Sequence, residues 1–193
     1  FMYGQYKRIT NLYEGVFTGK GRSFGGSLAR PEATGYGLIY IVEEMLKAAG
    51  KELKGKVLAV SGSGNVAQYA IQKAESLGAK VVTCSDSSGY VYDPEGIKLD
   101  VLFDIKQVKR GRISEYAERV PGASFHAGER PWAVNCDVAL PCATQNELNG
   151  EEAKTLIENG CFCVAEGANM PSDEHAVDVF LEKKILYMPG KAA

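Results

Sequence analysis

Short apolar runs alternate with longer amphipathic segments along most of the chain. The run Val57 to Val60 is too short for a helix and is typical of a strand buried on both faces. Comparable runs predict strands over residues 80–84, 136–140, 161–165 and 185–188, with a shorter one at 123–126. Helical periodicity with glycine, proline or capping signals predicts helices over residues 38–49, 65–77, 97–108, 112–120, 149–159 and 173–183, and possible helical spacing also links Tyr3, Tyr6, Ile9 and Tyr13.

This alternation predicts the fold class. Strands that alternate with helices form a mainly parallel sheet with helices on both faces, which is a doubly wound, Rossmann-like α/β fold. Right-handed crossovers then place the carboxyl ends of the strands on one edge, where ligands bind at the point at which strand order reverses. We expect that edge to collect residues 62–67, 86–88, 141–146 and 166–169.

A glycine-rich turn follows the first strand and opens the helix at 65–77. It consists of Gly62, Ser63, Gly64, Asn65, Val66 and Ala67. The first glycine permits a tight turn, the second lets a pyrophosphate approach the backbone, and the alanine allows close packing of helix and strand. The helix start offers free N–H groups to the phosphates. Asp86 ends the next strand about 20 residues further on, where a carboxylate can meet an adenosine ribose. The pattern predicts a dinucleotide site.

Polar residues after the later strands are candidates for the nicotinamide half of that site. Ala143, Thr144, Asn146 and Asn169 are placed to line it. Thr144 and Asn146 could equally cap the following helix, whereas Asn169 favours a ligand. Thr34 lies near the first turn of the helix before the glycine turn, where its hydroxyl could bind the backbone or a ligand.

Other segments are interpreted as structural. The glycines of residues 18–27 precede no strand-to-helix turn, so Lys20 and Arg22 are expected in a solvated linker and not in a phosphate site. Residues 87–96 are rich in turn signals and are expected to form a turn-rich excursion. His126 has no serine or carboxylate pattern around it, which favours a structural role.

Composition narrows the class of protein. A net charge of −2 without a basic block argues against nucleic acid or an anionic membrane as the main partner. No apolar run reaches membrane-spanning length and no signal peptide opens the chain. With five cysteines, only two histidines and no C-x-x-C pair, we expect reduced, buried thiols in a cytoplasmic protein and no metal site. Cys161 and Cys163 alternate along a predicted strand and are expected to share one face.

Six motifs in order resemble the hexameric, NADP-dependent glutamate dehydrogenases over essentially the whole chain. They are Arg30 to Gly37, Val60 to Ala70, Ser85 to Gly89, Leu140 to Glu147, Ala165 to Pro171 and Pro189 to Ala193. The resemblance implies interconversion of L-glutamate with 2-oxoglutarate and ammonia. It also implies a connecting segment at residues 1–35, a dinucleotide-binding domain at residues 36–193, and a substrate domain outside this chain, consistent with a start that lacks methionine.

The resemblance assigns roles to individual positions. Thr34 and Asn65 match cofactor-binding positions, and Asp86, Ser87 and Lys106 match the set around the ribose 2′ position. The Asp86 carboxylate alone favours NAD, because it accepts a hydrogen bond from a ribose 2′-hydroxyl and repels a 2′-phosphate. Serine hydroxyls and a lysine could offset that repulsion. The resemblance favours NADP, with NAD the less favoured cofactor.

No catalytic residue is assigned within the chain. The lysine and aspartate that transfer protons in the resembled family lie in its substrate domain, and its substrate-binding serine lies beyond residue 193. We therefore expect an inactive fragment of a full-length homo-oligomer, a hexamer by resemblance, whose small-molecule substrates are glutamate, 2-oxoglutarate and ammonia. The alternatives are a non-catalytic nucleotide-sensing module and the cofactor domain of a leucine, phenylalanine or valine dehydrogenase.

Overall fold

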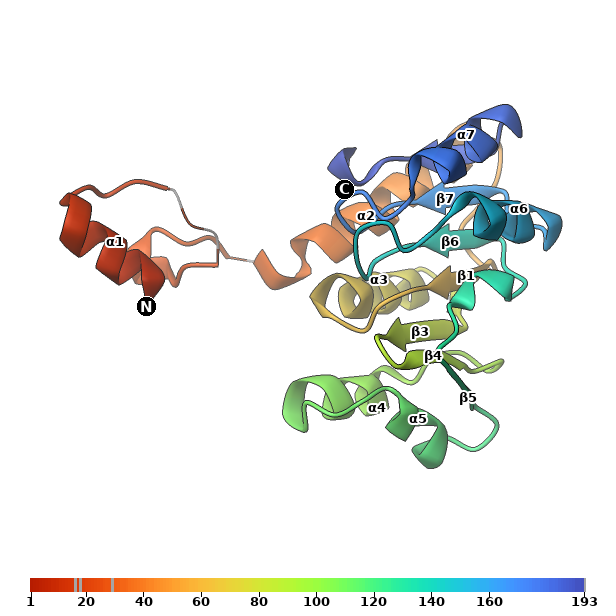
Figure 1. The fold of residues 1–193 in the computed structure, drawn as a ribbon, viewed down its shortest axis with the longest axis horizontal. Coiled ribbons are helices and arrows are strands. Elements are labelled where there is room, and N and C mark those ends of the chain that lie inside the picture. The colour runs from red at the N-terminus through yellow and green to blue at the C-terminus, as the bar shows by residue number, and fades with distance from the viewer. Residues whose placement is uncertain (16, 18, 29, 193) are drawn as a thin grey trace.

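A computed structural model describes residues 1–15, 17, 19–28 and 30–192. Residue 18 of the predicted linker lies outside this range. Helix α1 (Met2–Thr10) and a 3₁₀ turn (Arg22–Phe24) form an N-terminal segment that lies apart from the α/β body (Figure 1). Helix α2 (Arg30–Ala48) enters the body and begins before the predicted boundary at residues 35 and 36. That boundary stays a prediction.

The main sheet has five parallel strands in the order β2-β1-β6-β7-β8. They are β1 (Val57–Val60), β2 (Lys80–Val81), β6 (Val138–Leu140), β7 (Cys163–Ala165) and β8 (Leu186–Met188). Strand β2 lies on one side of β1, and the chain returns to the other side with β6. Strand order therefore reverses beside the end of β1, where the glycine turn begins. The predicted doubly wound α/β class is confirmed.

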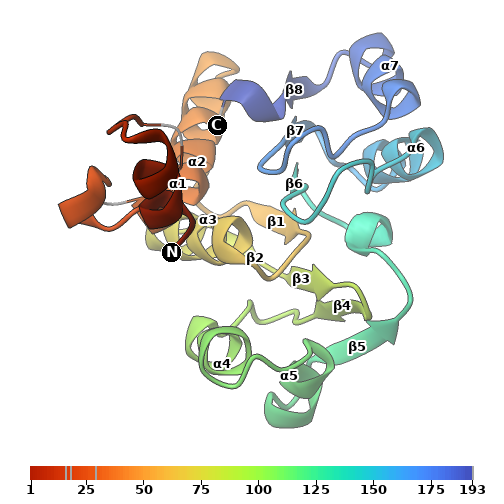
Figure 2. The same cartoon turned by 60° about the vertical axis from the view of Figure 1, so that its left-hand side comes forward.

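Helices cover both faces of this sheet, as predicted. Side chains alternate along β1: Leu58 and Val60 belong to one apolar cluster, and Ala59 belongs to a second. The first cluster packs under α2 and α3 (Asn65–Ser76), and the second under α6 (Gly150–Glu158) and α7 (Glu174–Glu182). Figure 2 shows the two helix pairs on opposite sides of the strands. The continuous apolar runs follow from burial on both faces.

Helices α2 and α3 approach each other closely at Gly35. A Cβ atom there would lie 2.7 Å from the backbone nitrogen of Ala70 and 2.8 Å from the carbonyl oxygen of Val66. Both atoms belong to the backbone of α3, so they cannot rotate away. The spacing of the two helices depends on the missing side chain.

The predicted strand at 80–84 is wrong as a single element. It divides at Val82 into β2 and β3 (Thr83–Asp86), and β3 joins an antiparallel sheet with β4 (Gly89–Tyr92) and β5 (Ser124–Ala127). The Thr83 hydroxyl accepts from the N–H of Val60 at 2.8 Å and donates to its carbonyl at 3.0 Å. A side chain thus replaces the ladder bonds that would continue β2 along β1.

The turn-rich excursion expected at residues 87–96 contains a strand that the sequence did not reveal, β4. Asp86 pairs with Gly89 at the turn of a tight β3–β4 hairpin, and Gly89 has a φ of 147°. A Cβ atom at Gly89 would lie 2.1 Å from the carbonyl oxygen of His126. His126 on β5 stacks on Tyr90 with ring centroids 4.5 Å apart, which is consistent with a structural role. The turn signals marked the hairpin and concealed the strand after it.

The helix predicted at 97–108 is shorter and less regular than its periodicity indicates. Helix α4 (Leu99–Phe103) continues as a π-helical turn at Asp104–Val108. Val108, expected on the apolar face, is 74% exposed. One extra residue in a turn rotates the following side chains by about 100°, and this rotation explains the outward position. Helix α5 (Ser114–Arg119) follows as a short polar helix, as predicted.

Helix ends follow their sequence signals elsewhere. The Asp173 carboxylate caps α7 by accepting a hydrogen bond from Ala176 N at 2.8 Å, and Gly78 adopts a φ of 83° after α3.

The prediction that Cys161 and Cys163 share one face of a strand is wrong. Strand β7 begins only at Cys163, and the two thiols lie in different apolar clusters. All five cysteines are buried and free. Over the described part of the chain, no helix is long and apolar enough to cross a membrane, and no metal-ligating group of three side chains occurs.

The half-buried carboxyl of Glu75 on α3 gives a pH-dependent stability. Burial raises its pKa from an ordinary 4.5 to about 7, against a smaller lowering by Lys98. The unfolded chain releases this proton first, so the free energy of unfolding falls as pH rises from 4.5 to about 7. The free energy of unfolding of Glu75→Gln should not show this fall. Relative to wild type, the variant should therefore become more stable by roughly 1 kcal/mol between the two pH values, after allowance for solvent screening. Urea unfolding at both ends checks this; the exposed Glu118→Gln control should show no such gain.

Candidate functional site

A cavity of about 700 Å³ opens at the carboxyl edge of the parallel strands, where strand order reverses. Four segments line it: the glycine turn after β1, the end of β3, the segment after β5 and the loop after β6. Lys106 from the π-helical turn completes the wall. The predicted site residues that line it are Gly62, Ser63, Gly64, Asp86, Ser87, Lys106, Ala143, Thr144 and Asn146.

The glycine turn has the geometry of an anion cradle. Gly62 has a φ of 80°, and its N–H donates to the Ser85 hydroxyl at 2.7 Å, which fixes the turn against β3. Gly64 is the N-cap of α3, and no side chain of the described residues caps that helix. The first N–H groups of α3 are therefore left for a ligand. A Cβ at Gly64 would meet no described atom within 4 Å. Ala67 is fully buried behind the turn.

The Asp86 carboxylate is held by four hydrogen bonds. It accepts from the backbone N–H and hydroxyl of Ser88, from Ile113 N at 3.0 Å and from Lys106 Nζ at 3.3 Å. Burial raises the pKa of Asp86, but these hydrogen bonds together outweigh it and leave the pKa below its usual value. The carboxylate is thus ionised and partly neutralised by Lys106, which also donates to the Gly111 carbonyl at 3.0 Å.

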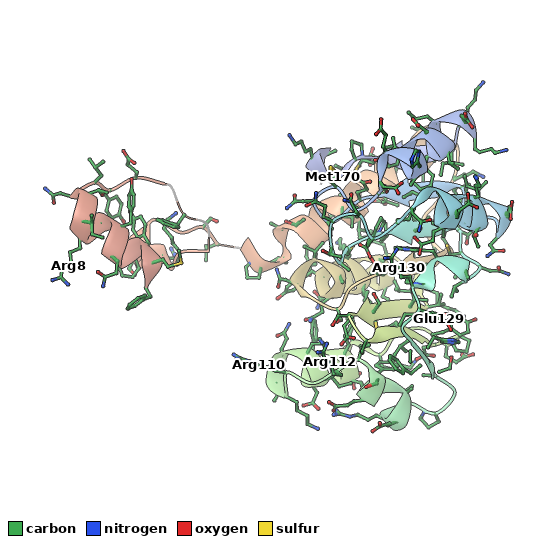
Figure 3. All side chains as sticks on the ribbon, viewed as in Figure 1. Arg8, Arg110, Arg112, Glu129, Arg130 and Met170 are labelled. Carbon is green, nitrogen blue, oxygen red and sulfur yellow. The ribbon has the colours of Figure 1, made fainter. Side chains whose placement is uncertain are left out.

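A second cation lies beside this carboxylate and was not singled out from the sequence. The Arg112 guanidinium donates to the exposed Ser87 hydroxyl at 2.7 Å. Its only signal was its position as the first residue of the predicted helix at 112–120; in the structure it precedes α5. Figure 3 places Arg112 beside the α4–α5 segment, and Arg130 and Met170 higher, toward β6 and β7. The cavity therefore has a cationic end at β3.

The loop after β6 is fixed by the buried carboxylate of Glu147. Its Oε1 accepts from the backbone N–H groups of Ala143 at 2.9 Å and Thr144 at 3.3 Å. Asn146 adopts a φ of 53°, and its N–H donates to the Met170 carbonyl at 3.0 Å. Thr144 and Asn146 do not cap α6, because Asn149 is its N-cap and forms a capping box with Glu152. Their side chains remain exposed at the cavity.

Four predicted site residues lie outside the cavity lining: Thr34, Asn65, Val66 and Asn169. Thr34 is half-buried on α2, and the Asn65 side chain donates to the Pro31 carbonyl. Val66 packs against the first apolar cluster, and Asn169 is exposed in the loop after β7. Asn65 therefore joins the glycine turn to α2. Their roles toward a cofactor stay predictions.

Glu147 and Arg130 line the cavity and were missed as site residues. Glu147 lies within the motif Leu140 to Glu147, but its burial depends on β6 and on Trp132, which donates to its carbonyl at 3.2 Å. Arg130 Nη1 donates to the same carbonyl at 2.9 Å and pairs with Glu152 at 3.1 Å. No local pattern marks Arg130, because its place depends on the path of the chain from β5 to β6.

Comparisons with known proteins agree with this architecture. Residues 25–193 match the family described as glutamate/leucine/phenylalanine/valine dehydrogenase. The chain is 60% identical to the NADP-specific glutamate dehydrogenase of Haemophilus influenzae and 59% identical to the NAD(P)-specific glutamate dehydrogenase of Xylanibacter ruminicola. Each alignment covers the whole chain, and 43% and 44% of the respective relative.

Solved structures give the same result. A crystal structure of Plasmodium falciparum glutamate dehydrogenase superposes with a TM-score of 0.91 at 49% identity, over 98% of this chain and 41% of that one. This chain thus spans less than half the length of the proteins it matches. The extent of the family match and the level of identity lead to one conclusion: the chain belongs to the glutamate/leucine/phenylalanine/valine dehydrogenase family.

Proposed function

We propose that this chain is the NADP-binding part of a glutamate dehydrogenase. The full enzyme would convert L-glutamate, NADP and water to 2-oxoglutarate, ammonia and NADPH. The observation that carries the proposal is the uncapped start of α3, where Gly64 faces a cavity lined at one end by Asp86, Ser87 and Lys106. Arg112 contacts Ser87 from outside that lining. Both relatives are named glutamate dehydrogenases, which favours glutamate over leucine, phenylalanine or valine.

The residues present fit a dinucleotide. The pyrophosphate would be held by N–H groups at Gly64 and the first turn of α3, since a Cβ built at Gly64 meets only open space. The acid at the end of β3 marks the adenosine side, so the nicotinamide would lie toward the loop after β6. Bound NADP supplies the ring carbon that exchanges a hydride with the amino acid. This chain's residues would position the ring and exclude water on one side.

NADP is favoured over NAD by the balance of charge around Ser87. Asp86 is partly neutralised by Lys106, and Arg112 adds a positive charge that no carboxylate within the described residues offsets by an ion pair. A 2′-phosphate placed near the Ser87 hydroxyl would meet two cations. The two relatives are named as NADP-specific and NAD(P)-specific, which is compatible with this preference.

The remaining parts of the proposal come from the family. Proton transfer would require residues outside this chain, so the chain alone would bind cofactor and turn over nothing. Thr34, Asn65 and Asn169 would reach the cofactor when the substrate domain closes. The full protein would be a cytoplasmic homo-oligomer, a hexamer by resemblance.

A titration of the purified chain tests the proposed function. Quenching of protein fluorescence, with Trp132 as the single tryptophan, should report saturable binding of NADPH. Added glutamate and NADP should give no NADPH absorbance. Absence of binding to either NADPH or NADH would overturn the proposal, and glutamate-dependent NADP reduction would overturn the inactivity of the fragment.

The cations near Ser87 give a direct prediction on specificity. We expect Lys106→Gln and Arg112→Gln each to weaken NADPH binding about tenfold, because each removes a charge-assisted contact with the 2′-phosphate. Binding of NADH should change less than threefold, roughly, since it lacks that phosphate. Lys109→Gln is the matched control, because its ammonium pairs with Asp104 instead. Parallel titrations with both cofactors give the ratio; an equal loss for NADH would contradict a 2′-phosphate role.

A further inference from the structure

The buried carboxyl group of Glu147 lies in the wall of the cavity, at the loop after β6. The residue is only 6% exposed, although it lines the cavity together with Ala143 and Thr144. It follows β6, on the opposite side of the glycine turn from Asp86. The proposed function gives this part of the chain no role for a charge. A neutral side chain could accept the same two backbone hydrogen bonds.

Glu147 is held in one place by groups from two strand ends. Burial raises the pKa of Glu147, whereas the nearby Ser61 hydroxyl at the end of β1, the two N–H groups of the loop and the charge of Arg130 act to lower it. Ser61 Oγ in turn accepts from Cys142 N at 2.9 Å. The carboxylate therefore cannot swing out to solvent, and its charge acts at a fixed position.

The other charges at this end do not cancel it. Arg130 contacts the carbonyl of Glu147 and is half-exposed, and its own ion pair is with Glu152. Glu129 also lines the cavity and adds to the negative charge. Among these groups Glu147 is the buried one, so solvent screens its field least.

We propose that Glu147 sets the relative affinity for the two redox forms of the bound cofactor. The oxidised nicotinamide ring is a cation and the reduced ring is neutral. A fixed carboxylate beside the ring stabilises the oxidised form selectively, and leaves the affinity for the reduced form nearly unchanged. The inference rests on the proposed function, because it requires a nicotinamide dinucleotide in the cavity.

The test measures dissociation constants of NADP and NADPH for the purified chain, with three variants. Glu147→Gln keeps the size and an acceptor oxygen but removes the charge, so NADP should bind about tenfold more weakly while NADPH changes little. Glu147→Asp keeps the charge but shortens the reach to the loop. Both affinities should fall with the NADP to NADPH ratio retained. Glu151→Gln removes an exposed charge on α6 and is the matched control.

Each outcome decides between the proposals. If wild type binds neither form, the proposed function fails and this inference fails with it. If wild type binds both and Glu147→Gln leaves their ratio unchanged, only this inference is overturned. Should the Gln variant not fold, Glu147→Asp still tests the claim, since a tenfold change of its ratio would contradict a role for the charge.

Discussion

Replacement of Gly64 by alanine is expected to abolish tight dinucleotide binding while the fold stays intact. Gly64 has a φ of −81°, so an alanine suffers no backbone strain, and its Cβ would enter open space in the unliganded chain. In the proposed complex the pyrophosphate would occupy that space at the start of α3. We expect roughly a 100-fold loss of NADPH affinity, or about 2.7 kcal/mol.

The measurement pairs a binding titration with thermal unfolding. Gly4→Ala is the matched control, because a Cβ there also meets open space but lies on α1, away from the cavity. Its affinity should equal that of wild type, and its midpoint should not fall below that of wild type. If Gly64→Ala binds NADPH as wild type does, the phosphates do not rest at this turn, and the proposed site would be wrong.

Gly35→Ala is expected to have the opposite effect, a loss of stability that does not depend on cofactor. Alanine normally stabilises a helix interior relative to glycine by about 1 kcal/mol. Here its Cβ would lie 2.7 Å from the backbone of α3, so the two helices must separate. Forced separation of packed elements costs about 1–3 kcal/mol, so we expect a net loss of up to about 2 kcal/mol.

Urea unfolding of Gly35→Ala, Gly64→Ala and Gly4→Ala side by side checks this pair of predictions. Only Gly35→Ala should have a lower midpoint than wild type. At urea concentrations low enough for all three variants to be folded, only Gly64→Ala should fail to bind NADPH. An unchanged midpoint for Gly35→Ala would show that α2 can move away from α3 at little cost. The contact between the two helices would then be less restrictive than the structure indicates.

The parallel sheet could be predicted because its signals are local. Val57 to Val60 is apolar on both faces, and Gly78 and Asp173 mark helix ends by their own conformations and hydrogen bonds. The division of the strand at 80–84 could not, because it depends on the Thr83 hydroxyl meeting the backbone of Val60, 23 residues earlier. The π-helical turn is also hidden, since its periodicity resembles that of a regular helix.

The residues of the candidate site could be predicted from the sequence only where they lie next to a predicted strand. The glycine turn and Asp86 are adjacent to strands that the apolar pattern reveals, so the topology brings them together. Arg112 and Glu147 depend on tertiary contacts: one on the packing of α5 against the β3–β4 hairpin, the other on burial between β1 and β6. Sequence reasoning identifies residues next to elements more readily than residues whose partners are distant.

The division of the chain at Val82 separates two tasks. Pyrophosphate and nicotinamide would be held by loops of the parallel sheet, whereas Asp86, Ser87, Lys106 and Arg112 all belong to the antiparallel sheet and its two short helices. Residues 83–127 would thus form the segment that contacts the adenosine ribose. Exchange of that segment between dehydrogenases is a route by which NAD and NADP users can arise from one another without change to the catalytic half of the molecule.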